Sequence, residues 1–288
     1  MFGWSTGAHD VDALIAKRKY PKAIAAVRKK LEEDPRSIRW RQQLADLLAL
    51  EGENQEAVQI LSKLAQEFVE DGIDAKGIAV LKKIQRIEPG HRKVEEQITE
   101  LIRRRRRGSI KARLPKPETD ELVVVRLSDE HLREPPPRIP KKLAGVSSSA
   151  LFSDFSADDL LAFIQGLQLK TFAPGQIIVT EGEPGDSLFV LASGAVRVYV
   201  RDGIGTSEQV RLLNQGEFFG EVSLLSKSQR TATIVTCCPC EILELDRPTL
   251  NRIAKQHPEI PSIIYSAYKR RVNSPEELQA RGEPPQPL

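Results

Sequence analysis

The sequence predicts a multidomain α+β protein, with an all-α part first and a β jelly-roll barrel (a double-stranded β-helix) with flanking helices second. Three observations support this fold class. Apolar residues recur at helical spacing in the first third of the chain, a proline-rich stretch follows, and short apolar runs separated by glycine turns fill most of the rest. A chain of 288 residues is long enough for two modest domains, each with its own core.

Residues 8–105 carry the helical pattern. They are rich in Ala, Leu, Lys and Glu, and apolar residues such as Leu44, Leu47 and Leu48 lie three or four positions apart, as on one face of a helix. Helix-breaking residues divide the region into short helices, because proline lacks a backbone N–H and glycine readily ends a helix. These residues are Pro35, Gly52, Gly72 and Pro89.

The helical region contains a weak repeat. Two segments align with Ala23 over Ala57, 34 residues apart, and a third copy at a shorter offset has Gly77 in the same small-residue position. The period, the small residues and the prolines after the helices resemble the tetratricopeptide repeat (TPR). The resemblance implies that helical hairpins stack into a TPR-like solenoid that binds a protein partner. A generic helical bundle with chance periodicity is the alternative.

Residues 106–147 form a basic, proline-rich linker. Six prolines between Pro115 and Pro140 favour an extended chain over a helix. The run Arg103–Ile110, "RRRRRGSI", overlaps the start of the linker and resembles the inhibitory segment of cyclic-AMP-dependent kinase regulatory subunits. This resemblance implies that Ser109 is a phospho-acceptor or a pseudosubstrate residue. A solvated basic helix end, or a site for an anionic surface or partner, would explain the same run.

Residues 148–272 have the pattern of the β domain. Ser156 is a suitable N-cap for a first helix, with two aspartates in the first turn. Short strand-like runs then alternate with glycine turns, which predicts an antiparallel barrel. The chain returns to a helical pattern from Arg247 to Arg271, and residues 273–288 are expected to form a disordered tail.

The stretch Phe218–Ile234, "FFGEVSLLSKSQRTATI", combines a Gly-Glu pair with an arginine among small residues. Together with the strand and turn pattern before it, the stretch resembles the phosphate-binding cassette of the cyclic-nucleotide-binding domain. That domain occurs in catabolite-activator-type regulators, kinase regulatory subunits and nucleotide-gated channels, and the similarity runs from about Leu151 to Arg271. The residues that match the ligand-binding positions of the cassette are Gly220, Glu221, Val222, Ser223, Arg230, Thr231 and Ala232.

The resemblance implies a role for several of these residues. Arg230 would meet the cyclic phosphate with charge-assisted hydrogen bonds, and Gly220 would let the backbone approach the ligand. Glu221 would accept a hydrogen bond from the ribose 2′-hydroxyl, and a short helix over "EVSLLS" would present backbone N–H groups to the phosphate. Thr231 stands where family members with a hydroxyl group tend to favour a guanine base. The resemblance leaves both cAMP and cGMP as the expected ligand.

Two residues depart from the pattern of the cassette. Gln229 replaces a proline before the arginine, which loosens the loop. Ser223 replaces an alanine and adds a hydroxyl group that could reach a phosphate oxygen. The alternative is a ligand-free barrel in which Glu221 and Arg230 pair with each other.

Composition excludes several other classes of protein. No apolar run approaches the ~18 residues that a membrane-spanning helix needs, and the first residues lack the pattern of a secretory leader. The three cysteines, Cys237, Cys238 and Cys240, form one run, so neither a disulfide framework nor a zinc site is expected, and a cytoplasmic location is the default. No nucleophile lies in a pattern with a base, so we expect neither an enzyme nor a cofactor.

The charge distribution and the length of the final segment argue against nucleic acid as a partner. Residues 1–107 carry 22 Lys and Arg against 17 Asp and Glu, whereas residues 148–288 carry 13 against 17. The basic excess is concentrated in one arginine run and gives no broad face for nucleic acid. The segment after the last helix is too short and too rich in proline for a helix-turn-helix, so no DNA-binding domain is expected.

The sequence therefore predicts a cytoplasmic signalling adaptor, in which the TPR-like repeats bind a protein partner and the barrel senses cAMP or cGMP. Ligand binding would order the cassette and move the helical segment Arg247–Arg271. A ligand-free scaffold and an inhibitor of the kinase-regulatory-subunit type, acting through Arg103–Ile110, are the alternatives.

Overall fold

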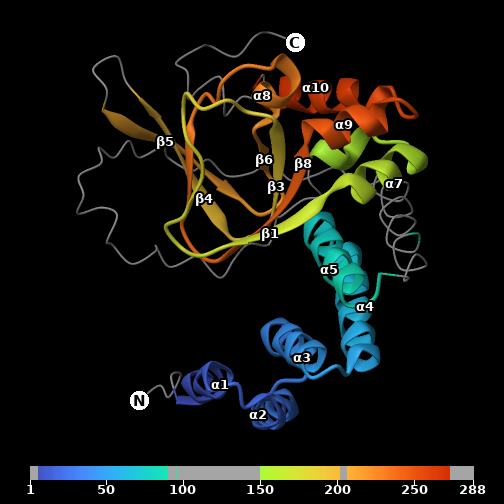
Figure 1. Cartoon of the computed structure of the whole chain (residues 1–288), viewed down its shortest axis with the longest axis vertical. Helices are drawn as coiled ribbons and strands as arrows, with labels where there is room; N and C mark the ends of the chain where they lie inside the picture. Colours follow the sequence, from blue (N-terminus) through green and yellow to red (C-terminus); the bar gives the residue numbers. More distant parts are fainter. Residues whose placement is uncertain (1–5, 90–95, 97–149, 202–205, 273–288) are drawn as a thin grey trace.

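The computed structural model describes residues 6–89, 96, 150–201 and 206–272 of the chain. The predictions for the linker at 106–147, for Arg103–Ile110 with Ser109, and for the tail at 273–288 therefore lie outside the described residues. The described part consists of N-terminal helices, two antiparallel sheets, and further helices that flank the sheets (Figure 1). Within it, no helix combines the length and the apolar character that a membrane span requires.

The N-terminal helices pack in chain order, each against the next. The prediction of short helices separated by breakers is confirmed, and the helices are α1 (Thr6–Ala16), α2 (Tyr20–Glu33), α3 (Ile38–Leu50), α4 (Asn54–Glu70) and α5 (Asp74–Ile87). Gly52 and Gly72 follow α3 and α4 with φ of +86° each, a left-handed conformation that glycine adopts without steric cost. The amide of Glu53 then donates to the carbonyl of Leu48 at 2.9 Å, which closes the helix end.

The aligned small residues lie where helices cross. Ala23 and Ala57 are fully buried, on α2 and α4. Gly77, on α5, is also buried, and a Cβ atom there would lie 2.7 Å from Cγ2 of Val69 on α4. The third copy of the repeat has a shorter offset because α5 directly follows α4 and packs against it, whereas α2 and α4 are separated by α3.

The second half of the chain forms two four-stranded sheets, here called the sheet domain. One sheet has the order β1-β8-β3-β6 and the other β2-β7-β4-β5, and all the neighbouring strands are antiparallel. The strands are β1 (Gln168–Phe172), β2 (Ile177–Val179), β3 (Ser187–Ser193), β4 (Ala195–Arg201), β5 (Ser207–Asn214), β6 (Phe218–Phe219), β7 (Thr233–Thr236) and β8 (Cys240–Asp246).

Strand β3 is buried on both faces. Phe189 and Leu191 belong to a cluster that includes Val196 and Ile234 of the other sheet. Leu188, Val190 and Ala192 alternate with them along the strand and belong to a different cluster, which continues into the N-terminal helices. This alternation follows from the two-residue period of a strand.

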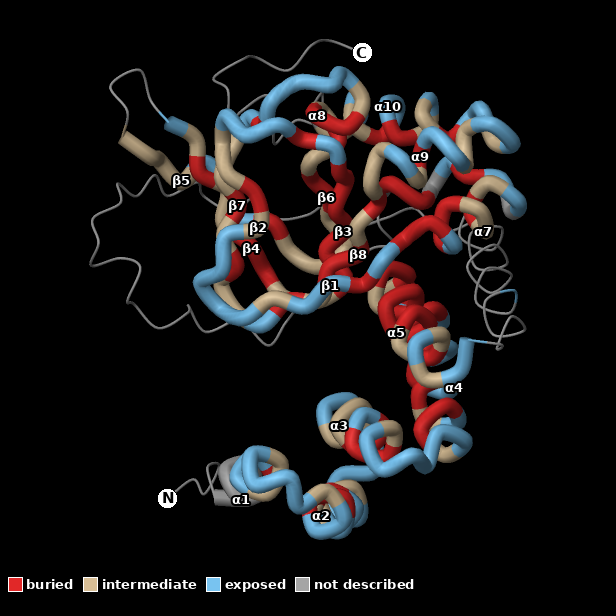
Figure 2. The backbone as a smooth tube through the Cα atoms, in the orientation of Figure 1, coloured by how far each residue is buried: buried red, intermediate tan, exposed pale blue. Residues whose placement is uncertain are grey.

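Helix α5 docks directly on the sheet domain, against β1, β3 and β8. Lys82 donates to the backbone carbonyl of Gln165 at 3.3 Å, and Arg86 donates to that of Leu169. Lys83 forms an ion pair with Glu241 of β8, with 2.7 Å between Nζ and Oε1. Figure 2 shows buried backbone continuing from α4 and α5 into β3 and β8, so one core joins the two halves.

Helices flank the sheets on both sides in sequence. Before β1 lie η1 (Ala150–Asp154) and α7 (Ala157–Gly166), and the predicted N-cap Ser156 accepts from the amide of Asp159 at 3.2 Å. After β8, the segment Arg247–Arg271 is divided into α9 (Arg247–Ala254) and α10 (Glu259–Val272). Pro258 lies between them, where it cannot donate a backbone hydrogen bond and disfavours helical geometry in the preceding residue.

Candidate functional site

The residues of the predicted cassette meet where β6 leads into a short helix, α8 (Glu221–Ser226), opposite the start of β3. The predicted helix over "EVSLLS" is therefore confirmed. Gly220 precedes it with φ of +84°, and a Cβ atom at this position would lie 2.6 Å from the carbonyl oxygen of Ser187 and 2.8 Å from Nη1 of Arg230. Only glycine fits a turn with this conformation and so little space.

Arg230 lies under this turn and is 7% exposed. Its Nη1 donates to the carbonyl of Ser187 at 2.8 Å and to that of Gly220 at 3.3 Å, and the guanidinium carbon is 5.5 Å from the centre of the Phe189 ring. Burial lowers the pKa of Arg230. Nearby carboxylates act to raise this pKa, and Asp186 has the largest effect among them. None of the described carboxylates forms an ion pair with Arg230, so its charge is held by carbonyl dipoles and an aromatic face.

Glu221 is 2% exposed and divides its two carboxylate oxygens. Oε1 accepts from Nη2 of Arg271 at 2.5 Å, whereas Oε2 is buried and has no hydrogen-bond partner among the described residues. Arg271 also donates to the carbonyl of Phe218 at 2.5 Å and lies 4.8 Å from the centre of its ring. Glu221 thus pairs with the end of α10, and the alternative pairing with Arg230 is not the one found.

The other cassette residues surround these two charges. Ser223 is buried, and its hydroxyl donates to the carbonyl of Gln229 at 3.2 Å, so it ties α8 to the loop before Arg230. Val222 and Ala232 are half-buried, and Thr231 is exposed. Gln229, which replaces a proline, forms a β-bridge with Pro184.

Two basic residues at the site were not predicted to take part in it. Arg271 reaches Glu221 from α10, and Arg247 at the start of α9 donates to the carbonyls of Ser223 (2.7 Å), Gly185 (3.1 Å) and Leu224. Arg247 therefore caps the C-terminal end of α8, in addition to the amide of Lys227, which also donates to the carbonyl of Ser223. The only feature of the sequence that pointed to Arg271 was the basic end of the last helix, and this feature does not indicate that Glu221 is its partner.

Gly185, in the turn before β3, lies against the site. A Cβ atom there would be 2.4 Å from Cβ of Ser223 and 2.7 Å from Nε of Arg230. The turn before β3 therefore allows Arg230 and α8 to approach each other. This close approach has a different cause from that at Gly220, because Gly185 does not have a positive φ.

The cysteine run begins in the turn between β7 and β8 and ends with Cys240, the first residue of β8. Burial and the neighbouring Cys238 raise the pKa of Cys240 to about 12, so this thiol is not a ready nucleophile. Within the described residues, no group of three or more His, Cys, Asp or Glu side chains is placed to hold a metal ion.

Two family models match the chain. Residues 169–257 match the cyclic nucleotide-binding domain, and residues 14–81 match the tetratricopeptide repeat. The first match includes α8 and the whole cassette, and the second runs from the last turn of α1 through α2, α3 and α4 into α5.

Several curated proteins resemble part of the chain. The cAMP-dependent protein kinase regulatory subunit of Yarrowia lipolytica is 34% identical over 38% of this chain and 28% of its own length. The cGMP-dependent protein kinase egl-4 of Caenorhabditis elegans is also 34% identical, over 38% of this chain and 14% of its own length. Among solved structures, the catabolite activator protein of Thermus thermophilus is 30% identical over 43% of this chain and 58% of its own, with a TM-score of 0.40.

The chain therefore spans less than a third of the length of these two kinase proteins. The similarity to both lies in a part of the chain of about the size of the sheet domain. With the match to the family model and the geometry of the cassette, the result is clear: this chain carries a cyclic nucleotide-binding domain, preceded by tetratricopeptide repeats.

Proposed function

We propose that this protein is a non-enzymatic signalling adaptor of the cytoplasm, which binds cAMP or cGMP in its sheet domain and a protein partner through its N-terminal helices. In this proposal the two sheets close into a jelly-roll barrel around the ligand, and the helices form a TPR-like solenoid. Regulation by a cyclic nucleotide is supported by the family match and by the relatives that depend on cAMP or cGMP.

The observation that carries the proposal is the pair of incompletely satisfied charges in the cassette. Glu221 has a buried Oε2 without a partner, and Arg230 is buried without a carboxylate partner among the described residues. A buried polar atom that makes no hydrogen bond costs about 1–3 kcal/mol, more when it is charged, so such atoms are rare unless a ligand satisfies them. An acceptor beside a cation suits a ligand that has both hydroxyl groups and a negative charge.

A cyclic nucleotide meets these requirements. Its phosphate carries one negative charge, which Arg230 would neutralise with the N–H groups that it does not use for Ser187 and Gly220. The first backbone N–H groups of α8 lack acceptors within the helix and would also face the phosphate. The ribose 2′-hydroxyl would donate to Oε2 of Glu221, while Oε1 keeps Arg271.

The ligand would act on the rest of the molecule through two contacts. Arg271 joins the cassette to α10, and Ser187 joins Arg230 to β3, on which α5 packs. Binding would therefore favour one arrangement of α10 and α5 over another, by as much as the ligand's affinities for the two arrangements differ. A change in the position of α5 would alter the surface that the N-terminal helices offer to a partner.

Calorimetric titration of the full chain with cAMP and cGMP tests the nucleotide site. We expect micromolar or tighter binding of at least one nucleotide, loss of that binding in Arg230→Ala, and unchanged binding in the control Arg252→Ala, because Arg252 is exposed on α9. If neither nucleotide gives heat or any other signal of binding with the folded wild-type protein, the ligand-free scaffold is the correct interpretation.

A further inference from the structure

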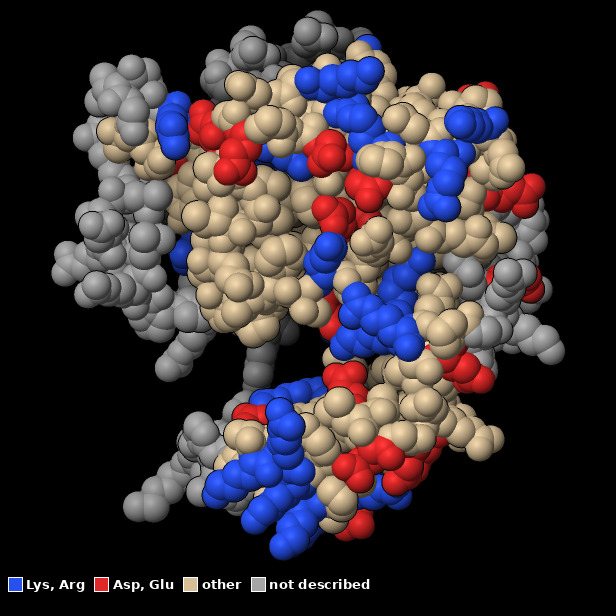
Figure 3. Space-filling model, viewed as in Figure 1, with Lys and Arg blue, Asp and Glu red and all other residues tan. Residues whose placement is uncertain are grey.

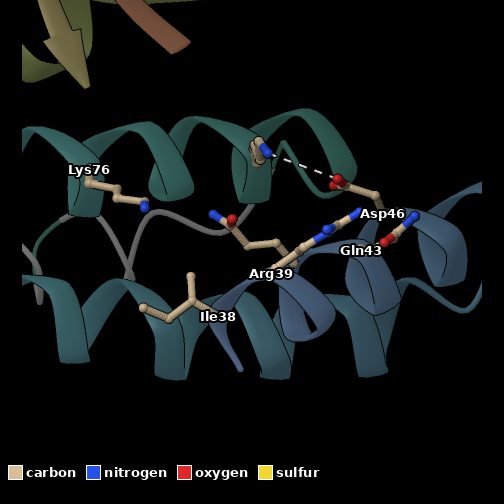
Figure 4. Close-up of a pocket in the computed structure, with 7 residues that line it drawn as sticks. Ile38, Arg39, Gln43, Asp46 and Lys76 are labelled. Atoms are coloured by element: carbon tan, nitrogen blue, oxygen red, sulfur yellow. Dashed lines mark ion pairs between the residues drawn. The ribbon is translucent and has the colours of Figure 1, made fainter. Parts of the chain in front are cut away.

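A hollow lies between α3 and α5, away from the cassette. Its cavity volume is about 550 Å³, and its polar lining includes Arg39, Gln42, Asp46, Lys76 and Lys83. Figure 4 shows that Arg39 and Asp46 come from α3 and Lys76 from the facing helix α5. Figure 3 shows basic side chains gathered where the N-terminal helices approach the sheet domain.

The cations of the hollow are only partly neutralised. Lys83 is shared by Glu241, at 2.7 Å, and Asp46, at 3.9 Å. Arg39 and Lys76 form no ion pair with a described carboxylate and lie instead against aromatic rings, 4.9 Å from the centre of that of Trp40 and 4.7 Å from that of Phe68.

The surroundings of Lys76 favour a bound anion. Burial lowers the pKa of Lys76, and distant Glu241 only partly compensates. Lys76 is thus half-buried without an ion-pair partner among the described residues, and an anion from outside would supply one.

A neutral donor points to the same chemistry. Nε2 of Gln42 is buried and has no hydrogen-bond partner among the described residues. An amide N–H in this position lacks an acceptor oxygen, which a carboxylate would provide. Ile38, at the same hollow, is 39% exposed and offers an apolar contact beside the charges.

We propose that this hollow binds an acidic peptide segment of the partner protein, with a carboxylate held by Lys76, Arg39 and the amide of Gln42 and an apolar side chain against Ile38. The inference rests on the partner-binding half of the proposed function and names the chemistry of that partner. A peptide fits better than a single small anion, because the hollow is much larger than one carboxylate and has an apolar contact as well as charges.

The position of Lys83 gives the site an unusual property. Glu241 belongs to the sheet domain and Asp46 to α3, and both now neutralise the ammonium group of Lys83, which would become a further partner for the peptide if either carboxylate were removed. Removal of either charge should therefore strengthen peptide binding. Loss of Asp46 also removes the one acidic side chain among the described residues that line the hollow.

The experiment measures fluorescence anisotropy of a fluorescein-labelled peptide that alternates glutamate with leucine, added to the full chain. We expect Lys76→Met and Gln42→Leu each to weaken binding roughly tenfold, since each removes a hydrogen bond to a charged ligand group. Asp46→Asn should strengthen binding by several-fold. Lys63→Met is the matched control without effect, because Lys63 is exposed on α4 and does not line the hollow.

Three outcomes would overturn the inference. They are no binding of the peptide to the folded protein, equal losses in Lys76→Met and Lys63→Met, and displacement of the peptide by inorganic phosphate at matching concentration, which would indicate a site for small anions only. If Lys76→Met does not fold, the expected gain in Asp46→Asn still decides. Nucleotide titration of the same variants separates the two proposals, because peptide binding without nucleotide binding contradicts only the nucleotide site.

Discussion

At the scale of single residues, the two carboxylate oxygens of Glu221 have different surroundings. Oε1 is committed to Arg271, and buried Oε2 has no partner among the described residues. A carboxylate that is fully satisfied by arginine would gain little from a ligand hydroxyl. The half-satisfied carboxylate instead offers a strong acceptor in a place from which water is largely excluded.

This division predicts selectivity for the sugar. We expect 2′-deoxy-cAMP to bind at least roughly tenfold more weakly than cAMP, because a hydrogen bond to a charged group is worth about 1.5–3 kcal/mol. In Glu221→Ala the two ligands should bind with nearly equal affinity. Calorimetry with both ligands and both proteins gives the four constants of the cycle. If the wild type and Glu221→Ala preferred cAMP over 2′-deoxy-cAMP by the same factor, a group other than Glu221 would bind the 2′-hydroxyl.

The sequence predicted the site residues that lie close together along the chain, but not the partners that folding brings to them. Gly220, Glu221 and Arg230 fall within a short stretch whose residue types suit a phosphate. Arg271 is 50 positions from Glu221, and its role depends on the angle at which α10 returns to the cassette. Long-range geometry of this kind leaves no local pattern in the sequence.

At the scale of the elements, the crossing of α4 and α5 depends on the absence of one side chain. Gly77→Ala should improve helix propensity by up to about 1 kcal/mol. Crowding of the new Cβ against Val69 and the carbonyl of Ala65 should cost more, about 1–3 kcal/mol, so we expect a net loss of stability in urea denaturation. The double variant Gly77→Ala, Val69→Ala should show a smaller effect of Gly77→Ala than the wild-type background does. An equal effect in both backgrounds would rule out this contact as the cause.

The first turn of α7 makes stability depend on acid. The hydroxyl of Ser156 donates to Oδ2 of Asp159 at 2.6 Å, and this hydrogen bond is the main cause of the lowered pKa of Asp159, with His257 also contributing. A lowered pKa adds stability above the ordinary value of 3.8, and that stability is lost as pH falls through the folded-state pKa.

We therefore expect Ser156→Ala to reduce the free energy of unfolding by about 1 kcal/mol at neutral pH, through loss of the helix cap and of the hydrogen bond to Asp159. The difference from wild type should shrink as pH falls from 3.8 through the lower folded-state pKa of Asp159, without vanishing. Urea denaturation at neutral pH and at a pH below 3.8 measures this difference in stability. Ser262→Ala, on the exposed face of α10, is the control. A difference that does not change with pH would assign the whole effect to the cap.

Most elements followed from local patterns in the sequence. The glycine-bounded strands, the Ser156 cap and the helix after Gly220 all depend on neighbouring residues, and the structure contains each of them. The order of strands within the two sheets was not predictable in this way, because it is set by contacts between distant segments such as β1 with β8.

At the scale of the whole molecule, the helices and the sheet domain share one core. The change from helical to strand-like patterns along the sequence predicted two parts. No pattern of neighbouring residues indicated that α5 would pack on β3, with Lys83 against Glu241. Both groups of this ion pair are largely shielded from water, with side chains 18% and 17% exposed. A pair in such a place holds the two parts together only while both charges remain.

We therefore expect the two parts to unfold together in the wild type and separately in Lys83→Glu. Trp40 lies on α3, so in a Trp4→Phe background the tryptophan fluorescence follows the N-terminal helices. Pulsed thiol labelling of buried Cys240 follows the sheet domain. The two transitions should coincide in urea for the wild type and for the control Lys63→Glu, and diverge in Lys83→Glu. Separate transitions in the wild type would mean that the shared core is too weak to couple the parts.

Strand β3 has a consequence for the distance over which a bound ligand can be felt. Its first residue accepts the hydrogen bond of Arg230, Phe189 lies beneath that guanidinium, and Leu188 and Val190 face the core shared with the helices. A strand rises about 3.3 Å per residue, so Ser187, which contacts Arg230, lies only one residue from Leu188 in the shared core. Because backbone and packing leave the strand little freedom to bend, a shift at its start would reach the helical half as a rigid displacement, without any intermediate hinge.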